Sequence, residues 1–267
     1  LQQLAAEHDA VYCFSCVMPE IVYDTLAVRP LLGGVHNDFQ LEHYADRFTA
    51  RNLARFVAIG CANDNLRRRL LAAGLHDRVL VTSDGIDAER FTPPTQPRTG
   101  PVRVGWVGQT QHSGGKLKRF HELVRPACHL AGVPLLPAVR EINPIPYQRM
   151  PDYYHHVDIL VVASRGEGAS GPLLEAAASA CMPLSTPVGV ARRQITHGID
   201  GLIVPGELDA LTDALHWCRR HPDAVRDMGR AAHATVHRDW TWPARAEGYA
   251  RLFDCALNPD ARGTAAA

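Results

Sequence analysis

The sequence predicts an α/β fold with two doubly wound domains, and three observations support this. Short apolar runs of strand length recur along the chain, separated by stretches with helical periodicity. The run from Ile159 to Ala163 is apolar throughout and rich in β-branched residues, as expected of a parallel strand buried on both faces. A proline-rich stretch, Thr92 to Pro101, divides the series into two parts. Together these features favour parallel sheets covered by helices.

The first predicted domain spans residues 1–96. Its apolar runs predict strands over Asp9 to Ser15, Arg29 to His36 and Phe56 to Ala62, and a fourth from Val79. Helical periodicity is found around 21–28, over 41–55 and over 63–73. His36 ends the second strand, at the edge of an open parallel sheet where ligands collect.

The second predicted domain spans residues 101–240, and a last helix over 241–257 is expected to return to the first domain. Strands are predicted over Val102 to Gly108, Pro134 to Pro137 and Ile159 to Ala163. A short helix and the apolar segment Gly201 to Pro205 follow further along the chain. Helices are predicted from about Lys118 to Ala131, over Met150 to Asp158, and over 207–220 and 222–237. The loop from Gln109 to Lys118 is expected to face a phosphate.

The corner after Ala163 has the character of an anion site. Its loop is small, polar and glycine-rich, and Pro172 stands where a helix takes its first residues, so a helix is predicted to begin at Ser170 or Gly171. Free N–H groups and the helix dipole favour phosphate there. Glu167 in the loop and Glu175, expected in the first helical turn, flank this site. Because a carboxylate repels a diphosphate, each is expected to accept hydrogen bonds from hydroxyls, which a nucleotide sugar has on both sides of its diphosphate.

The segment EGASGPLLEAAASACMPLSTPVG, with seven residues between Glu167 and Glu175, resembles the E-x7-E region of the family-4 (group 1) retaining glycosyltransferases. The resemblance covers the chain after about Pro101, with weaker echoes before it. It implies a GT-B fold of two Rossmann-like domains, the first abbreviated here. It also implies transfer of a hexosyl unit from a UDP- or GDP-sugar to a hydroxyl-bearing acceptor with retention, in polysaccharide or glycoconjugate biosynthesis, without a cofactor or metal.

The same resemblance assigns roles to individual positions. Glu175 would hold the ribose hydroxyls, Glu167 would lie against the donor sugar, and His36 would approach that sugar from the first domain. Lys118, with Lys116 as its substitute, would pair with the diphosphate. Gln109 stands where relatives have arginine or asparagine, and it can donate a hydrogen bond but cannot neutralise charge. The other positions assigned to donor binding are Gly108, Arg140, Gly168, Ser170 and Gly171.

Composition excludes several other classes of protein. The formal net charge is zero and the pI is about 7.4, which argues against a nucleic-acid-binding surface and a polybasic membrane anchor. Peripheral membrane association is expected only through the acceptor. No apolar run has the length of a membrane span, and no signal peptide is recognisable, so a cytoplasmic location is expected. The seven cysteines are odd in number and mostly isolated in the sequence, which predicts reduced thiols and argues against a disulfide framework. Cys13 and Cys16 form a C-x-x-C pair, and no second pair completes a zinc site. The sequence does not predict the oligomeric state.

Two further interpretations remain open. One is an epimerase or phosphorylase of the same architecture, and the other is a non-catalytic protein that binds nucleotide sugars. Fewer than a hundred residues precede the proline-rich stretch, whereas a first domain of this type needs about 150. We therefore expect that the sequence is an excerpt or a truncated relative that lacks the opening, acceptor-side strands.

Overall fold

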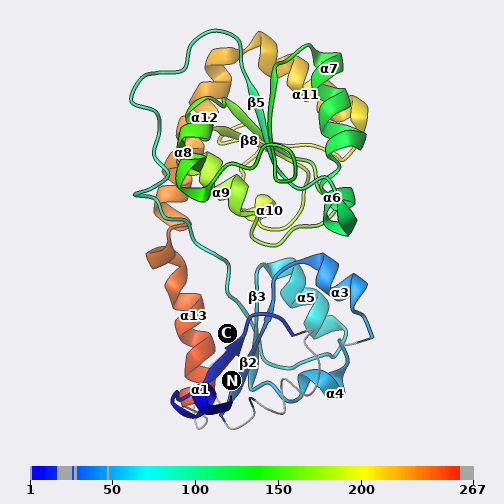
Figure 1. The fold of residues 1–267 in the computed structure, drawn as a ribbon, viewed down its shortest axis with the longest axis vertical. Helices are drawn as coiled ribbons and strands as arrows, with labels where there is room; N and C mark the ends of the chain where they lie inside the picture. The colour runs from blue at the N-terminus through cyan, green and yellow to red at the C-terminus, as the bar shows by residue number, and fades with distance from the viewer. Residues whose placement is uncertain (1, 17–25, 27–28, 47, 259–267) are drawn as a thin grey trace. The chain divides into compact units, whose positions relative to one another are not determined.

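The structure is a computed structural model, and it describes residues 2–16, 26, 29–46 and 48–258. The chain separates into two compact units (Figure 1). Unit 1 comprises Leu1–Asp84 and Arg245–Ala267, and unit 2 comprises Gly85–Ala244.

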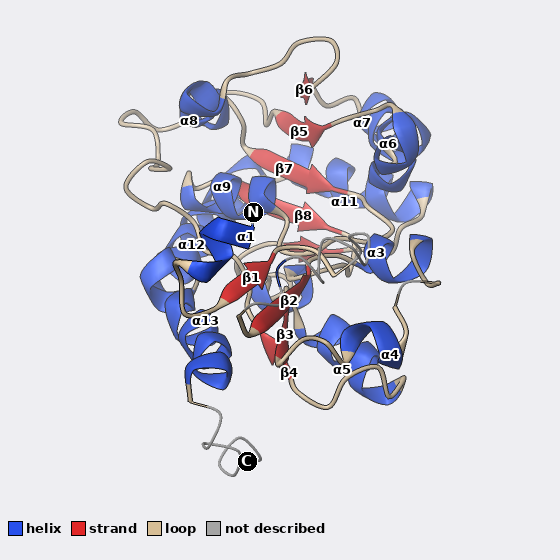
Figure 2. Cartoon of the chain, turned by 60° about the horizontal axis from the view of Figure 1, so that its bottom comes forward, coloured by secondary structure: helices blue, strands red, loops and turns tan. Residues whose placement is uncertain are grey.

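Unit 1 is built on a parallel sheet in the order β1-β2-β3-β4 (Figure 2). Its strands are β1 (Val11–Cys13), β2 (Leu31–Val35), β3 (Ala58–Cys61) and β4 (Val79–Val81). Its helices are α1 (Gln2–Ala6), α3 (Asp38–His43), α4 (Ala50–Leu53), α5 (Asp64–Ala72) and most of α13 (Trp242–Leu257). All four strands appear where the apolar runs predict them. The helix predicted around 21–28 falls, apart from Leu26, outside the described residues.

Local chemistry explains why the helices of unit 1 begin where they do. Asn37, Thr49 and Asn63 precede α3, α4 and α5, and each side chain accepts a hydrogen bond from a backbone N–H in the first turn. Instead of the single helix predicted over 41–55, the structure has α3, which ends at His43, and α4, which begins after the cap Thr49. On one face of the sheet Leu252 of α13 packs with Leu32 and Ala58, so the last helix closes the core of unit 1.

Unit 2 is built on a five-stranded parallel sheet in the order β6-β5-β7-β8-β9. The strands are β5 (Val104–Gly108), β6 (Leu135–Val139), β7 (Ile159–Val162), β8 (Met182–Ser185) and β9 (Leu202–Ile203). The helices are α6 (His112–Lys118), the π-helix η1 (Phe120–Val124), α7 (Arg125–Ala131), the 3-10 turn η2 (Tyr147–Arg149), α8 (Met150–His155), α9 (Gly171–Ala178), α10 (Ala191–Gln194), α11 (Leu208–Arg220) and α12 (Pro222–Asp239).

The helices of unit 2 cover both faces of its sheet (Figure 1). One core joins β5 and β7 to η1, α7 and α11, and a second joins β7 to α8, α9 and α12. The four-residue β7 is buried along its whole length, which accounts for its unbroken apolar sequence.

Strand order places the ligand-binding position of unit 2. From β5 the chain passes to β6 on one side and then to β7 on the other, so the order reverses between β5 and β7. In open parallel sheets, ligands bind at such a reversal, outside the carboxyl ends of the strands. The described strands of unit 1 follow chain order and show no reversal.

The boundary between the units differs from the predicted one at 96–101. The proline-rich stretch is fastened to unit 2, because the Arg98 guanidinium donates to the carbonyl oxygens of Tyr154 (3.0 Å) and Ser179 (2.7 Å). Phe91 is fully buried in the same unit. Proline-rich composition marks irregular backbone, but it does not reveal which domain holds that backbone.

The predicted helix ending at Ala131 is interrupted near its start. α6 ends at Lys118, Arg119 has a left-handed backbone (φ 53°), and the π-helix η1 then leads into α7. Lys118 is therefore the last residue of a short helix, which corrects the expectation that it stands at a helix start. A cation is favoured at that end of a helix dipole.

The cysteine side chains are reduced, as predicted. All seven cysteines are free, and six of them, including Cys13 and Cys16, are buried. Burial raises the pKa of the Cys128 and Cys218 thiols to about 12, so these thiols stay protonated.

Among the described residues, no helix combines the length and the apolar character that crossing a bilayer requires.

Candidate donor-binding site

The predicted site residues of unit 2 gather at the reversal between β5 and β7. Gly108 ends β5, Lys118 ends the helix that follows it, and Glu167 lies in the loop after β7. Arg140 directly follows β6, and its backbone N–H donates to the carbonyl of Gly108 at 2.9 Å. The parallel topology thus brings loops that are distant in sequence to one edge of the sheet.

An ion pair joins two of these residues. The Nζ atom of Lys118 lies 3.0 Å from Oε1 of Glu167, and the hydroxyl of Ser164 donates to the same oxygen at 2.7 Å. The Lys118 side chain is 28% exposed and that of Glu167 is 14% exposed, so the pair is partly buried but still reachable. Ser164 was missed by the sequence analysis. Its position directly after the apolar run, three residues before the glutamate, was the available signal.

Gly108 and Arg119 explain how Lys118 reaches this loop. A Cβ atom at position 108 would lie 2.7 Å from Cδ of Lys118, so the lysine stem passes over the glycine. Two contacts of the Arg119 guanidinium stabilise the left-handed turn at this residue. The guanidinium donates to the carbonyl of Gly206 at 2.7 Å and pairs with the carboxylate of Glu122 at 2.9 Å. Close backbone approach is therefore the reason for glycine at 108.

A second glycine holds the loop that carries Glu167. Gly189 has φ 53°, and a Cβ atom there would lie 2.3 Å from the carbonyl oxygen of Gly168. The next residue, Val190, donates its N–H to that same oxygen at 3.0 Å. Gly189 thus fixes the backbone beside Glu167. The sequence analysis did not single it out.

The helix after the loop begins as predicted, with Gly171 as its first residue and Ser170 as its cap. Ser170 has a left-handed backbone (φ 46°), and its carbonyl accepts the N–H groups of Leu173 and Leu174. The N–H groups of Ser170 and Gly171 precede these first helical hydrogen bonds and lie at the positive end of the helix dipole.

Glu175 lies one turn into α9, beyond the first turn where it was expected. The buried hydroxyl of Tyr154, in α8, donates to Oε2 of Glu175 at 2.8 Å. The other oxygen, Oε1, lies 3.6 Å from the point where a Cβ atom of residue 171 would be. Burial raises the pKa of Glu175, and the hydrogen bond from Tyr154 lowers it.

In the loop after β5, two backbone amides are used within the protein, and whether the loop faces a phosphate stays a prediction. The N–H groups of Thr110 and Gln111 both donate to the carboxylate of Glu141, with N to Oε1 distances of 3.1 Å. These two amides are therefore already occupied by an anion from the protein itself. Glu141, which follows Arg140 at the end of β6, was missed by the sequence analysis.

His36 belongs to unit 1, where it directly follows β2 as predicted. Its ring stacks on Phe14 (centroids 3.8 Å apart), its Nε2 lies 3.2 Å from the hydroxyl of Tyr12, and its backbone N–H donates to Gln40 at 2.7 Å. Burial lowers the pKa of His36, against an opposing effect of Asp84. Its approach to the donor sugar stays a prediction.

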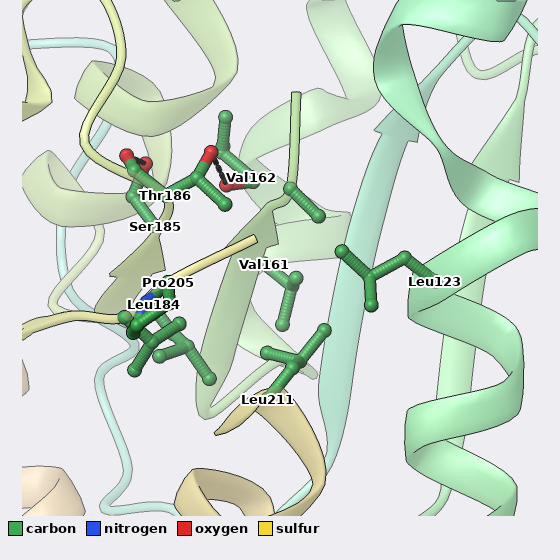
Figure 3. A pocket seen from close by; sticks show the side chains of 10 residues that line it. Leu123, Val161, Val162, Leu184, Ser185, Thr186, Pro205 and Leu211 are labelled. Carbon is green, nitrogen blue, oxygen red and sulfur yellow. Dashed lines mark hydrogen bonds between the residues drawn. The ribbon is translucent and has the colours of Figure 1, made fainter. Parts of the chain in front are cut away.

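One small void lies beneath this edge of the sheet, among β7, β8 and α11 (Figure 3). Leu123, Val161, Leu184 and Leu211 line it, with Ser185 and Thr186 at one end. The hydroxyl of Thr186 donates to the carbonyls of Ser164 and Val162, so it is already used inside the protein. Because the void has no room for the centre of a water molecule, we assign it to the core.

In the part of the chain that the structure describes, no group of three or more His, Cys, Asp or Glu side chains is arranged to hold a metal ion. Whether the site works without a metal or cofactor stays a prediction.

Known proteins resemble this chain in sequence and in fold. Residues 88–220 match the family described as glycosyl transferases group 1. A glycogen synthase from Mycobacterium tuberculosis is 22% identical over 234 residues, covering 79% of this chain and 56% of that protein. A D-inositol 3-phosphate glycosyltransferase from Corynebacterium urealyticum is 26% identical over 216 residues, covering 66% of this chain and 51% of that protein. The chain thus spans about half the length of these relatives.

Solved structures show the fold. Sucrose-phosphate synthase from Thermosynechococcus elongatus superposes with a TM-score of 0.75 at 14% identity, over 95% of this chain and 75% of that one. HepE from Anabaena, in complex with UDP-glucose, gives a TM-score of 0.75 at 16% identity, over 95% of this chain and 80% of that one. The fold is accordingly of the α/β GT-B type, as predicted.

Proposed function

Residues 88–220 of this chain belong to the group 1 glycosyltransferases, and from this premise we propose that the protein transfers a glycosyl unit from a nucleoside diphosphate sugar to a hydroxyl-bearing acceptor. We further propose retention at the anomeric carbon, an inference that rests on the sequence resemblance alone. UDP-glucose is the first donor to test, because HepE has this fold and its structure is a complex with UDP-glucose.

The observation that carries the proposal is the position of the Lys118–Glu167 pair at the reversal between β5 and β7. A cation there attracts a diphosphate, and a carboxylate beside it accepts hydrogen bonds from sugar hydroxyls. The N–H groups of Ser170 and Gly171 add partial positive charge. The site thus offers complementary groups for both parts of a sugar diphosphate.

The chemistry that these groups support is displacement of the diphosphate. As the bond from the anomeric carbon to the phosphate oxygen breaks, negative charge grows on the leaving group, and Lys118 and the amides at the start of α9 stabilise it. The acceptor oxygen forms the new bond to the anomeric carbon, and its proton passes to the leaving phosphate. Glu167 orients the sugar through its hydroxyls, and Glu175 fixes the ribose.

The test is a product analysis with UDP-glucose and GDP-glucose as alternative donors. We expect release of free nucleoside diphosphate, and a glycosylated product in which NMR shows the anomeric configuration of the donor. Lys118→Ala should reduce this release strongly. An epimerase would convert the donor without releasing the diphosphate, and a non-catalytic protein would bind it without turnover. Either result would contradict the proposal.

A further inference from the structure

Tyr154 reaches Glu175 from a neighbouring helix and has no exposed surface of its own. It lies in α8 with a relative exposure of 0%, and its hydroxyl donates to Oε2 of Glu175 at 2.8 Å. A buried hydroxyl and a half-buried carboxylate both require a hydrogen-bond partner, and here these two groups are partners of each other. The contact therefore fixes one of the two carboxylate oxygens.

The rest of the structure holds Tyr154 in place. Its backbone carbonyl accepts hydrogen bonds from the guanidinium of Arg98 (3.0 Å) and from Sγ of Cys181 (3.3 Å). Its ring meets that of Phe91 edge to face, with centroids 6.0 Å apart. Main chain and ring are thus fixed independently, so the hydroxyl has a defined direction.

The second carboxylate oxygen is turned toward the start of α9. Oε1 lies 3.6 Å from the position that a Cβ atom of residue 171 would take, and Gly171 is exposed. The carboxylate therefore has one oxygen hydrogen-bonded to Tyr154 and the other next to the exposed Gly171, whose amide is assigned to the diphosphate.

We propose that Tyr154 is a positioning residue for nucleotide binding, which holds Oε2 of Glu175 so that Oε1 receives a ribose hydroxyl. This inference rests on the proposed function, in which Glu175 binds the ribose. Tyr154 itself does not touch the nucleotide. Its effect is to keep the carboxylate in one orientation and in its charged form, which is the form that accepts hydrogen bonds from hydroxyls.

Other groups near Glu175 have to be considered in any pH experiment. Burial raises the pKa of the Tyr147 phenol in η2, and the charge of Glu175 raises it further. Asp87 acts in the same direction, and the Arg90 guanidinium, 5.2 Å from the centroid of the Tyr147 ring, opposes it. On α8 the titratable partner is Tyr154, whose pKa burial raises far above its usual value. Both tyrosines stay neutral between pH 5 and 8, so neither titrates in that range, and titration of the UDP phosphate is common to all variants.

The neighbouring tyrosine offers a matched control. The hydroxyl of Tyr153 donates to the carbonyl of Leu136 at 2.7 Å and accepts from the N–H of Trp106 at 3.1 Å. Tyr153→Phe thus removes a buried hydroxyl of the same kind from the same helix without touching Glu175. Comparing it with Tyr154→Phe separates positioning from loss of stability.

The experiment is calorimetric titration of UDP into the wild-type chain and four variants: Tyr154→Phe, Tyr153→Phe, Glu175→Gln and the Tyr154→Phe/Glu175→Gln double variant. At pH 7 we expect UDP affinity to fall about tenfold in Tyr154→Phe, the usual scale for one hydrogen bond to a charged group, and to stay unchanged in Tyr153→Phe. In the Glu175→Gln background, Tyr154→Phe should cause little further loss, because the two residues act as a unit.

The pH profile supplies a readout that a purely structural role would not move. Removing the Tyr154 hydroxyl takes away the interaction that lowers the pKa of Glu175, so the carboxylate takes up its proton at a higher pH. As pH is lowered from 8 to 5, Tyr154→Phe should therefore lose UDP affinity earlier than the wild type does. Tyr153→Phe should keep the wild-type profile.

The outcomes separate this inference from the proposed function. If Glu175→Gln weakens UDP binding but Tyr154→Phe changes neither affinity nor pH profile, the positioning role is wrong and the ribose role stands. If Glu175→Gln leaves UDP affinity unchanged, both are wrong. Should Tyr154→Phe not fold, carbon-13 NMR of the unmutated chain decides: UDP must shift the resonances of Glu175 Cδ and Tyr154 Cζ together, and a shift of Glu175 alone contradicts the inference.

Discussion

The ammonium of Lys118 and the carboxylate of Glu167 form an ion pair, with 3.0 Å between Nζ and Oε1. Sequence reasoning assigned the first to the diphosphate and the second to the donor sugar. If both roles are correct, the pair exchanges its internal bond for two bonds to the donor. Ser164 keeps one hydrogen bond to Oε1 during that exchange, so Glu167 is not left without a partner.

The first prediction concerns Lys118. Lys118→Ala should lower kcat more than it weakens donor binding, because the charge matters most when the diphosphate departs. A loss of about 10²-fold in kcat is the scale for one group that stabilises a developing anion. Steady-state kinetics with the donor identified in the product analysis provides the measurement.

The control for this prediction is the exposed Lys116, two residues earlier in α6. Lys116→Ala removes the same charge from the same helix, but Lys116 is not paired with Glu167. Its effect on kcat should be small. A larger effect from Lys116→Ala than from Lys118→Ala would show that the wrong lysine has been assigned to the diphosphate.

The second prediction separates the two glutamates. Glu175→Ala should weaken UDP and UDP-glucose binding alike, by about 1–3 kcal/mol, because it removes the acceptor for ribose hydroxyls. Glu167→Ala should leave UDP affinity nearly unchanged and weaken only the sugar nucleotide. Calorimetry on both variants tests this division, and equal loss of UDP affinity in the two would refute it.

Much of this site was predictable because its residues follow strands. Parallel topology puts the carboxyl ends of β5, β6 and β7 at one edge, so Gly108, Arg140 and Glu167 had to lie near one another. The start of α9 at Gly171 was equally readable, from Pro172 and the glycine-rich loop. Strand ends and helix starts are local features, and the sequence carries them directly.

The parts that were missed depend on contacts between distant segments. The residues next to Lys118 in the sequence do not predict the left-handed turn at Arg119, because that turn is stabilised by a hydrogen bond to the distant carbonyl of Gly206. Glu141 holds two amides of the loop after β5 from a different strand end. Tyr154 meets Glu175 only because α8 packs beside α9. Such pairings follow from tertiary packing, which periodicity does not reveal.

The third prediction uses the close approach at Gly108. In Gly108→Ala the new Cβ would lie 2.7 Å from Cδ of Lys118 and 3.0 Å from the Trp106 ring, so the lysine stem must move. We expect kcat to fall toward the value for Lys118→Ala, with the free energy of unfolding lowered by only about 1–2 kcal/mol. Thermal unfolding and kinetics on the same preparation give both quantities.

The double variant Gly108→Ala/Lys118→Ala tests the reason for that loss. Because Gly108→Ala acts through Lys118, it should cost little more activity once the lysine is gone. Additive losses in kcat would mean that Gly108 affects the donor directly.

The fourth prediction concerns pH and unit 1. Burial lowers the pKa of His36 in the folded chain, whereas in the unfolded chain the pKa is near 6.5. Below about pH 6.5 the unfolded chain therefore binds a proton that the folded chain resists, so the free energy of unfolding falls as pH falls. Urea unfolding at pH 7.5 and 5.5 should show a smaller decrease in His36→Gln than in the wild type. An exposed histidine, His129, serves as the control, and an equal reduction in His129→Gln would contradict this assignment.

The last prediction compares two glycines with positive φ in unit 2. Gly189 (φ 53°) faces the carbonyl oxygen of Gly168, which a new Cβ would approach to 2.3 Å, while Gly198 (φ 80°) has open space around its Cβ position. Gly198→Ala should cost only the left-handed backbone, about 1–2 kcal/mol. Gly189→Ala should cost this and also displace the loop that holds Glu167, so its loss of stability should exceed that of Gly198→Ala by about 2 kcal/mol or more. Donor turnover should fall in Gly189→Ala and persist in Gly198→Ala at a temperature where both are folded. Equal melting temperatures and equal turnover in the two variants would show that the contact between Gly189 and Gly168 does not hold the loop.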